Sequence, residues 1–113
     1  MTNIGRAVVV AATLLAAGAE AQDLSEIGDI QSGRKLAVQD CRSCHHIGPG
    51  SPGPQTRKEP PSFYAIANMA STTPTSLYVF LHTSHPTMPN LRLDKKESDD
   101  VIAYILSLRR QTQ

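Results

Sequence analysis

The pentapeptide Cys41-Arg42-Ser43-Cys44-His45 constrains this chain of 113 residues more tightly than any other stretch of it. Two thiols at this spacing can add to the two vinyl groups of one porphyrin, and the histidine that follows them can reach the iron. The motif C-x-x-C-H therefore predicts one haem c, bound covalently through Cys41 and Cys44, with His45 as an axial ligand of the iron.

Two other uses of a C-x-x-C pair fit the rest of the sequence less well. A structural zinc site needs about four ligands, and the chain has only two cysteines. His45 and His46 would add two nitrogens, but adjacent histidine side chains seldom turn onto one ion. A dithiol redox motif belongs next to a βαβ pattern, and no strand-like alternation precedes Cys41. Because haem attachment uses both cysteines, we expect no disulfide.

The N-terminal segment, residues 1–21, has the features of a secretory signal peptide. Arg6 supplies a positive charge, residues 7–17 are apolar apart from Thr13, and the segment ends in Ala-Glu-Ala, which fits the A-x-A cleavage rule. We therefore expect export to the periplasm and a mature domain of residues 22–113. An uncleaved membrane anchor is the alternative, but the apolar run is shorter than the roughly 20 residues that a membrane-spanning helix needs. No membrane span is expected in the mature chain.

The charge of the expected mature chain argues against some classes of partner. The signal segment contains Arg6 and Glu20, so its removal leaves the formal net charge of +1 that the whole sequence has. A nucleic-acid-binding domain normally shows a strongly basic face, and no such face is indicated. A chain of this size forms one small domain with a modest core, so its fold and a buried haem are expected to depend on each other.

The mature chain is predicted to be all-α. Helical spacing of apolar residues and helix-capping signals mark four segments, and the stretch 48–61, rich in Gly and Pro, is expected to be an irregular loop. The expected helices run from Asp29 or Ser32, as cap, to Cys41; from Ser62 to Ala70; from Thr73, as cap before Pro74, to about Thr83; and from Asp94, as cap with Glu97 completing a capping box, to about Arg110. Their expected inward-facing residues are Leu36, Ala37, Phe63, Ile66, Ala67, Leu77, Phe80, Leu81, Val101, Tyr104, Ile105 and Leu108.

Over its whole mature part the chain resembles the class I cytochromes c. Members of that family place C-x-x-C-H at the end of an N-terminal helix and a Met-Pro pair in a loop ahead of the C-terminal helix. The matching pieces are residues 41–45, the sequence Met-Pro-Asn-Leu at 88–91, and residues 100–105. The family pairs a small residue of the first helix with an aromatic residue of the last, to which Gly33 and Tyr104 correspond. The resemblance implies a small cytochrome c fold in which the N- and C-terminal helices cross around one covalently bound haem.

Met88 is the expected second axial ligand. It lies in a loop bounded by Pro86 and Pro89, and cytochromes c use Met and His together. An alternative is that Met88 only fills a gap in the core, as methionine often does.

Three other side chains are weighed for the same position on the iron. Met69 lies in an expected helix with apolar neighbours, so it is assigned to the core. His82 or His85 would give a bis-histidine iron instead of a His/Met iron.

Residues around the haem are expected from the same resemblance. The family uses a carbonyl of a proline-containing loop to accept the second ring N–H of the proximal histidine, and Pro52 and Pro54 are the candidates. His46 is expected at the surface. Donors to the haem propionates are sought in Tyr64, Tyr78 and Arg57.

These features imply a periplasmic one-electron carrier, with the iron cycling between Fe(III) and Fe(II), and not an enzyme. Its partners would be redox proteins that donate and accept the electron, with the chain acting as a monomer or as a subunit of a redox complex. Two alternatives stay open. The chain is a cytochrome subunit docked to a dehydrogenase or oxidase, or, if Met88 does not ligate, a haem enzyme or gas-binding sensor.

Overall fold

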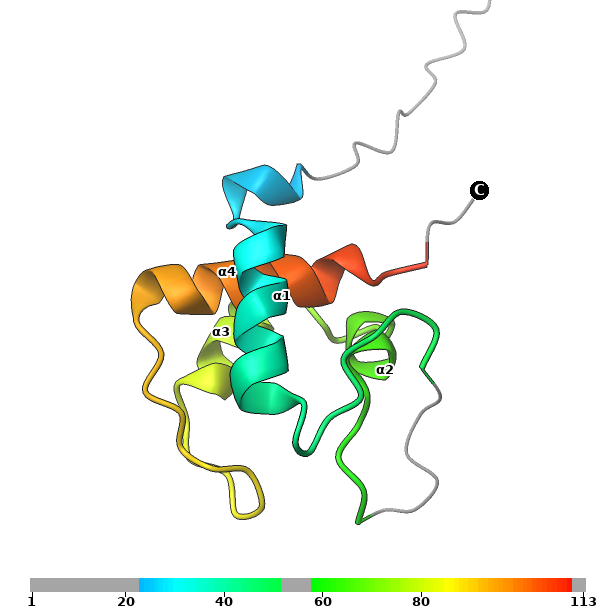
Figure 1. The fold of residues 1–113 in the computed structure, drawn as a ribbon, viewed down its shortest axis with the longest axis vertical. Coiled ribbons are helices and arrows are strands. Elements are labelled where there is room, and N and C mark those ends of the chain that lie inside the picture. The colour runs from blue at the N-terminus through cyan, green and yellow to red at the C-terminus, as the bar shows by residue number, and fades with distance from the viewer. Residues whose placement is uncertain (1–22, 52–57, 111–113) are drawn as a thin grey trace, which may run out of the picture.

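The computed structural model describes residues 23–51 and 58–110, and every regular element within these ranges is helical (Figure 1). The predicted all-α fold is therefore confirmed. The expected signal peptide lies outside the described residues. No helix in the described ranges is long and apolar enough to cross a membrane. In chain order the elements are the 3-10 helix η1 (Leu24–Glu26), α1 (Ile30–Leu36), the π-helical turn η2 (Ala37–Cys41), α2 (Phe63–Ala67), α3 (Pro74–Leu81) and α4 (Lys95–Ser107).

The first helix begins at Asp29 and continues without a break to Cys41. The Asp29 side chain accepts a hydrogen bond of 2.6 Å from the backbone N–H of Ser32, so Asp29 is the cap and Ser32 is not. The last turn, η2, is π-helical, and the N–H of Arg42 reaches back to the carbonyl of Ala37. Wider turns of this kind are frequent at functional sites, and this one ends at Cys41, the first cysteine of the haem motif.

The helix α1 lies across α4 in Figure 1, and Gly33 sits at the contact. A Cβ added to Gly33 would lie 1.9 Å from the carbonyl oxygen of Asp100 and 3.0 Å from Cβ of Tyr104. The predicted packing of Gly33 against Tyr104 is confirmed, although the closest atom belongs to Asp100. A second glycine, Gly28, also packs closely against α4, because a Cβ added to it would lie 2.5 Å from the backbone of Asp99, and no sequence signal had indicated this contact.

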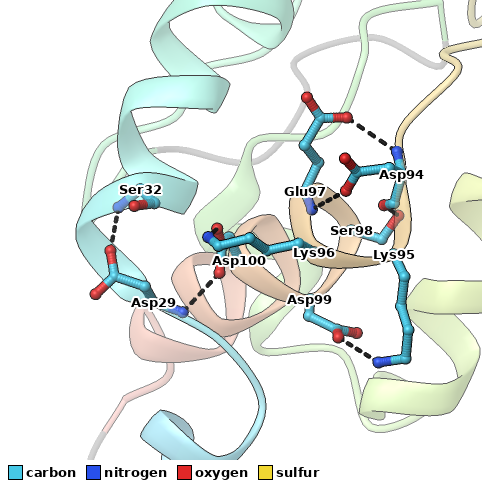
Figure 2. A network of polar contacts seen from close by, with 9 residues as sticks. All are labelled: Asp29, Ser32, Asp94, Lys95, Lys96, Glu97, Ser98, Asp99 and Asp100. Atoms are coloured by element: carbon cyan, nitrogen blue, oxygen red, sulfur yellow. Dashed lines mark hydrogen bonds and ion pairs between the residues drawn. The ribbon is translucent and has the colours of Figure 1, made fainter.

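A buried carboxylate joins the two helices at this crossing (Figure 2). Asp100, only 6% exposed, accepts a hydrogen bond of 2.8 Å from the backbone N–H of Asp29. Its other oxygen receives the Lys96 ammonium at 2.5 Å. Both carboxylate oxygens are thus occupied, which a buried charge requires.

The predicted capping box of α4 is confirmed, and the helix ends earlier than expected. Asp94 accepts from the N–H of Glu97 at 2.8 Å, and Glu97 accepts from the N–H of Asp94 at 2.9 Å. The helix stops at Ser107 because the next residues turn away to other partners. Arg109 donates to the carbonyl of Ala67 at 3.0 Å, a tertiary contact that the sequence does not reveal.

The helix α2 is also shorter than predicted, and this changes the position of one methionine. Ser62 caps the helix by accepting a hydrogen bond of 3.1 Å from the N–H of Ala65. The helix ends at Ala67, so Met69 lies beyond it, and Met69 is 50% exposed. The assignment of Met69 to a helix and to the core was wrong.

The helix α3 begins as predicted, with Thr73 as cap and Pro74 at the first helical position. A capping box completed by Ser76 was not expected. The helix ends at Leu81, two residues early. Of its expected inward face, Leu77 is buried, but Phe80 is 47% exposed, so that placement was wrong.

The core is centred on α4. The other buried apolar side chains come from η2, α2, α3 and Leu108, which follows α4, and they pack against α4. The buried apolar residues are Ala37, Phe63, Ala67, Leu77, Val101, Ile102, Ala103, Tyr104, Ile105, Leu106 and Leu108.

Candidate haem site

The C-x-x-C-H motif forms a tight turn directly after η2. The backbone N–H of Cys44 donates to the carbonyl of Cys41 at 3.1 Å, and the N–H of His45 donates to the same carbonyl at 2.9 Å. This turn brings both cysteines and the histidine to one end of the first helix. Cys41 is half-buried and Cys44 is exposed, so the outer thiol is the more accessible of the two.

The inner thiol lies against the core. Burial, with a smaller contribution from the charge of Asp40, raises the pKa of the Cys41 thiol to about 11. A free Cys41 thiol is therefore protonated at neutral pH. Once its sulfur is part of a thioether, the group no longer titrates.

The imidazole of His45 is held by a backbone carbonyl. Its Nδ1 lies 2.7 Å from the carbonyl oxygen of Pro61, and because a carbonyl only accepts, Nδ1 carries the proton and donates. Nε2 is then the ring nitrogen with a free lone pair. A carbonyl from a proline does hold the histidine, but the choice of Pro52 or Pro54 was wrong, and both lie outside the described residues.

The segment that supplies this carbonyl also holds the loop around His45. The N–H of Phe63 donates to the carbonyl of His46 at 2.9 Å. The rings of His45 and Phe63 pack with centroids 5.5 Å apart and planes at 51°. The His46 side chain itself is exposed, as predicted. His45 is thus positioned from two sides by residues 61–63.

Met88 lies in the loop between α3 and α4, on the stretch from residue 82 to residue 94. It is half-buried, whereas Met69 is exposed. Of the two methionines in the described part of the chain, Met88 is therefore the better shielded from water.

The two histidines that compete with Met88 are already engaged. His82 Nε2 lies 2.9 Å from the hydroxyl of Ser98 on α4. His85 Nε2 lies 3.0 Å from the carbonyl of Phe80, and the two rings stack at 3.7 Å. Either histidine would have to give up these contacts or turn to its other nitrogen to bind the iron.

The expected propionate donors have mixed positions. The Tyr64 hydroxyl accepts a hydrogen bond of 2.7 Å from Nε of Arg110. Tyr78 is exposed, and its ring packs against His82 with centroids 4.3 Å apart. Arg57 lies outside the described residues.

The donors in this region fit haem c better than zinc. Among residues 23–51 and 58–110, no three His, Cys, Asp or Glu side chains gather in a way that would hold a metal ion. The zinc interpretation therefore gains no support. Haem c needs instead two thiols at C-x-x-C spacing and one imidazole nitrogen, the groups that Cys41, Cys44 and His45 place in one turn.

Comparison with known proteins supports the same assignment. Residues 28–105 match the family model described as "Cytochrome C oxidase, cbb3-type, subunit III". The chain is also 33% identical over 96 residues to a protein named cytochrome c-552 from Bradyrhizobium diazoefficiens, an alignment that covers 85% of this chain and 90% of that protein. No solved structure gives a significant match. The chain belongs to this family and is a small c-type cytochrome, with covalently bound haem c and a role in electron transport.

Proposed function

We propose that this cytochrome is a periplasmic one-electron carrier whose haem is attached through Cys41 and Cys44 and ligated by His45 and Met88. The observation that carries the proposal is the hydrogen bond from His45 Nδ1 to the carbonyl of Pro61. This bond fixes the tautomer and the ring plane and leaves Nε2 as the nitrogen that would bind a metal, the arrangement found for ligating histidines.

We choose Met88 as the second ligand by comparing it with the three other side chains considered for this position. Met69 is exposed and follows directly after α2, whereas Met88 is half-buried in the longer loop after α3. His82 and His85 hold Nε2 in hydrogen bonds with Ser98 and Phe80. A thioether needs no second-shell hydrogen bond, so Met88 can bind the iron without breaking one.

Haem, when bound, supplies one-electron chemistry between Fe(III) and Fe(II). The thioether of Met88 is a weak donor to Fe(III), which raises the potential. The hydrogen bond between His45 and Pro61 holds the imidazole ring in place, which would limit structural rearrangement during electron transfer. If His45 and Met88 both ligate the iron, no coordination site would be open to a substrate, which would favour a carrier over an enzyme.

The periplasmic location rests on the signal features of residues 1–21. On this proposal the donor and the acceptor are redox proteins reached on the outer side of the cytoplasmic membrane. Fractionation of cells that express the full chain tests this. Holoprotein in the periplasmic fraction, starting near Gln22, supports the proposal, and cytoplasmic haem-free chain contradicts it.

A second candidate is a resident subunit of an oxidase or dehydrogenase. It is favoured by the description of the matched family, which names a subunit of an oxidase. Sedimentation of detergent extracts separates the two candidates. A free carrier sediments as a monomer, whereas a subunit sediments with a larger redox complex.

The ligands are tested by the visible spectrum of the exported protein, oxidised and reduced, with and without carbon monoxide. The proposal expects a low-spin spectrum, a weak ferric sulfur-to-iron band and no response to carbon monoxide. A high-spin spectrum or ready carbon monoxide binding means an open coordination position. In that case the His/Met carrier is ruled out in favour of an enzyme or a sensor.

A further inference from the structure

Tyr104 links the last helix directly to the loop that carries His45. Its hydroxyl donates a hydrogen bond of 2.7 Å to the carbonyl oxygen of Ile47, two residues after the histidine and 57 residues away from Tyr104 in sequence. The Tyr104 side chain is only 5% exposed. A buried tyrosine normally finds a partner for its hydroxyl. Here the partner lies in the loop of residues 45–47, which begins with the proposed ligand His45.

The ring of Tyr104 reaches the same histidine by a second route. It packs against Phe63 with centroids 6.3 Å apart and planes at 57°, and Phe63 in turn packs against His45 at 5.5 Å. Tyr104 thus contacts the loop after His45 through its hydroxyl, and reaches the ring of His45 through Phe63. Tyr104 itself is placed by the helix crossing, where its Cβ faces Gly33.

The side chain of Ile47 packs against the core, but in the described part of the chain few hydrogen bonds join the loop of residues 45–47 to the rest of the fold. The carbonyl of His46 is held by Phe63 and Nδ1 of His45 by Pro61, and both of these partners belong to one short segment. The Tyr104 hydroxyl is the bond that ties the loop to α4, the centre of the core. Phe63 also contacts the Tyr104 ring, a contact that does not need the hydroxyl, so loss of the hydroxyl would free the loop but not residues 61–63 from α4.

We infer that Tyr104 is a positioning residue for His45, and that its hydroxyl keeps the hydrogen bond between His45 and Pro61 formed. This inference rests on the proposed function, in which His45 binds the iron. Donation from Nδ1 makes the imidazole a stronger ligand and so stabilises Fe(III). Loss of the tyrosine hydroxyl should weaken that donation and raise the reduction potential.

The test compares Tyr104→Phe with Thr72→Val in the holoprotein. Tyr104→Phe keeps the ring and removes the bond to Ile47. Thr72→Val removes a similar hydrogen bond, from a buried hydroxyl to the carbonyl of Ile66 at 2.6 Å, at the link between α2 and α3. The readouts are the midpoint potential, the exchange rate of the His45 Nδ1–H by proton NMR, and the melting temperature.

The inference expects a higher potential in Tyr104→Phe and exchange of the His45 ring proton about fivefold faster, the population change produced by the loss of one hydrogen bond. Thr72→Val should lower the melting temperature to a similar extent with the potential and the exchange rate unchanged. Wild-type values of both readouts in Tyr104→Phe, or equal shifts in both variants, overturn the inference while leaving His/Met ligation intact. A wild-type spectrum without histidine ligation overturns the proposed function, and the inference with it.

Discussion

The carbonyl oxygen of Asp100 lies where a side chain on Gly33 would have to go, 1.9 Å from an added Cβ. This contact sets how closely α1 approaches α4. Because Cys41 ends the same continuous helix, the contact also places the haem-attachment turn relative to the core. Gly33→Ala should therefore destabilise the holoprotein by about 1–3 kcal/mol, the usual cost of overpacking, even though alanine is the better helix former.

The measurement for Gly33→Ala is urea denaturation followed by far-UV circular dichroism. Gln31→Ala, at an exposed position of the same helix, is the control and should change the free energy of unfolding by no more than about 0.5 kcal/mol. Equal stability of the two variants would show that the crossing is looser than the structure has it.

Asp100 is expected to stabilise the fold mainly as a hydrogen-bond acceptor. Asp100→Ala leaves the backbone N–H of Asp29 without its partner and should cost about 1–3 kcal/mol. Asp100→Asn keeps an oxygen for that N–H and loses only the ion pair with Lys96, so it should cost less. Chemical denaturation at neutral pH checks the order. Equal losses in the two variants would mean that the ion pair with Lys96, which both variants lack, supplies the stabilisation and the acceptor role does not.

Acid should weaken the start of the first helix. Hydrogen bonds from the side chain and backbone of Ser32 hold the pKa of Asp29 below its usual value of 3.8. As pH falls, the unfolded chain therefore takes up this proton first. The stabilisation is complete above pH 3.8 and is lost as pH falls through the lower pKa of the folded state.

This pH dependence is measured by the free energy of unfolding across the acid range in the wild type and in Asp29→Asn. Asparagine still caps a helix but cannot titrate, so the variant should show a shallower loss of stability in acid. Parallel acid profiles for the two proteins would show that Asp29 is not the group responsible.

Removal of the Met88 sulfur should open the iron. In Met88→Ala we expect loss of the ferric sulfur-to-iron band, a larger high-spin fraction, a lower potential and binding of carbon monoxide, because the weak thioether ligand that favours Fe(II) is gone. Met69→Ala removes an exposed methionine and is the matched control. A Met88→Ala protein with the wild-type spectrum would rule out Met88 as the ligand.

The helix starts were the most predictable part of the fold. The Asp94 and Glu97 capping box and the Thr73-Pro74 start are local arrangements of a few neighbouring residues, and the structure confirms them. Helix ends were less predictable because distant partners decide them. Arg109 leaves the line of α4 to reach the carbonyl of Ala67, and no local pattern marks such a contact.

Met69 and Phe80 show the same limit for side-chain burial. Both fit an apolar helical pattern in the sequence, and both are about half exposed. Periodicity tells which residues share a helix face. Which face meets the core depends on how the helices are placed in three dimensions.

The sequence alone determined the all-helical class, the haem motif and the chemistry of the side chains in that motif, because these depend on residue type and short spacing. Gly33 and Tyr104 were identified as a contact through a family resemblance, and the structure confirms that contact. Only the tertiary structure decided three hydrogen bonds: from His45 to the carbonyl of Pro61, from the backbone of Asp29 to Asp100, and from Tyr104 to the carbonyl of Ile47. These bonds join residues 16, 71 and 57 positions apart. They exist only because packing of the core onto α4 brings those backbone groups together, which a local sequence pattern does not encode.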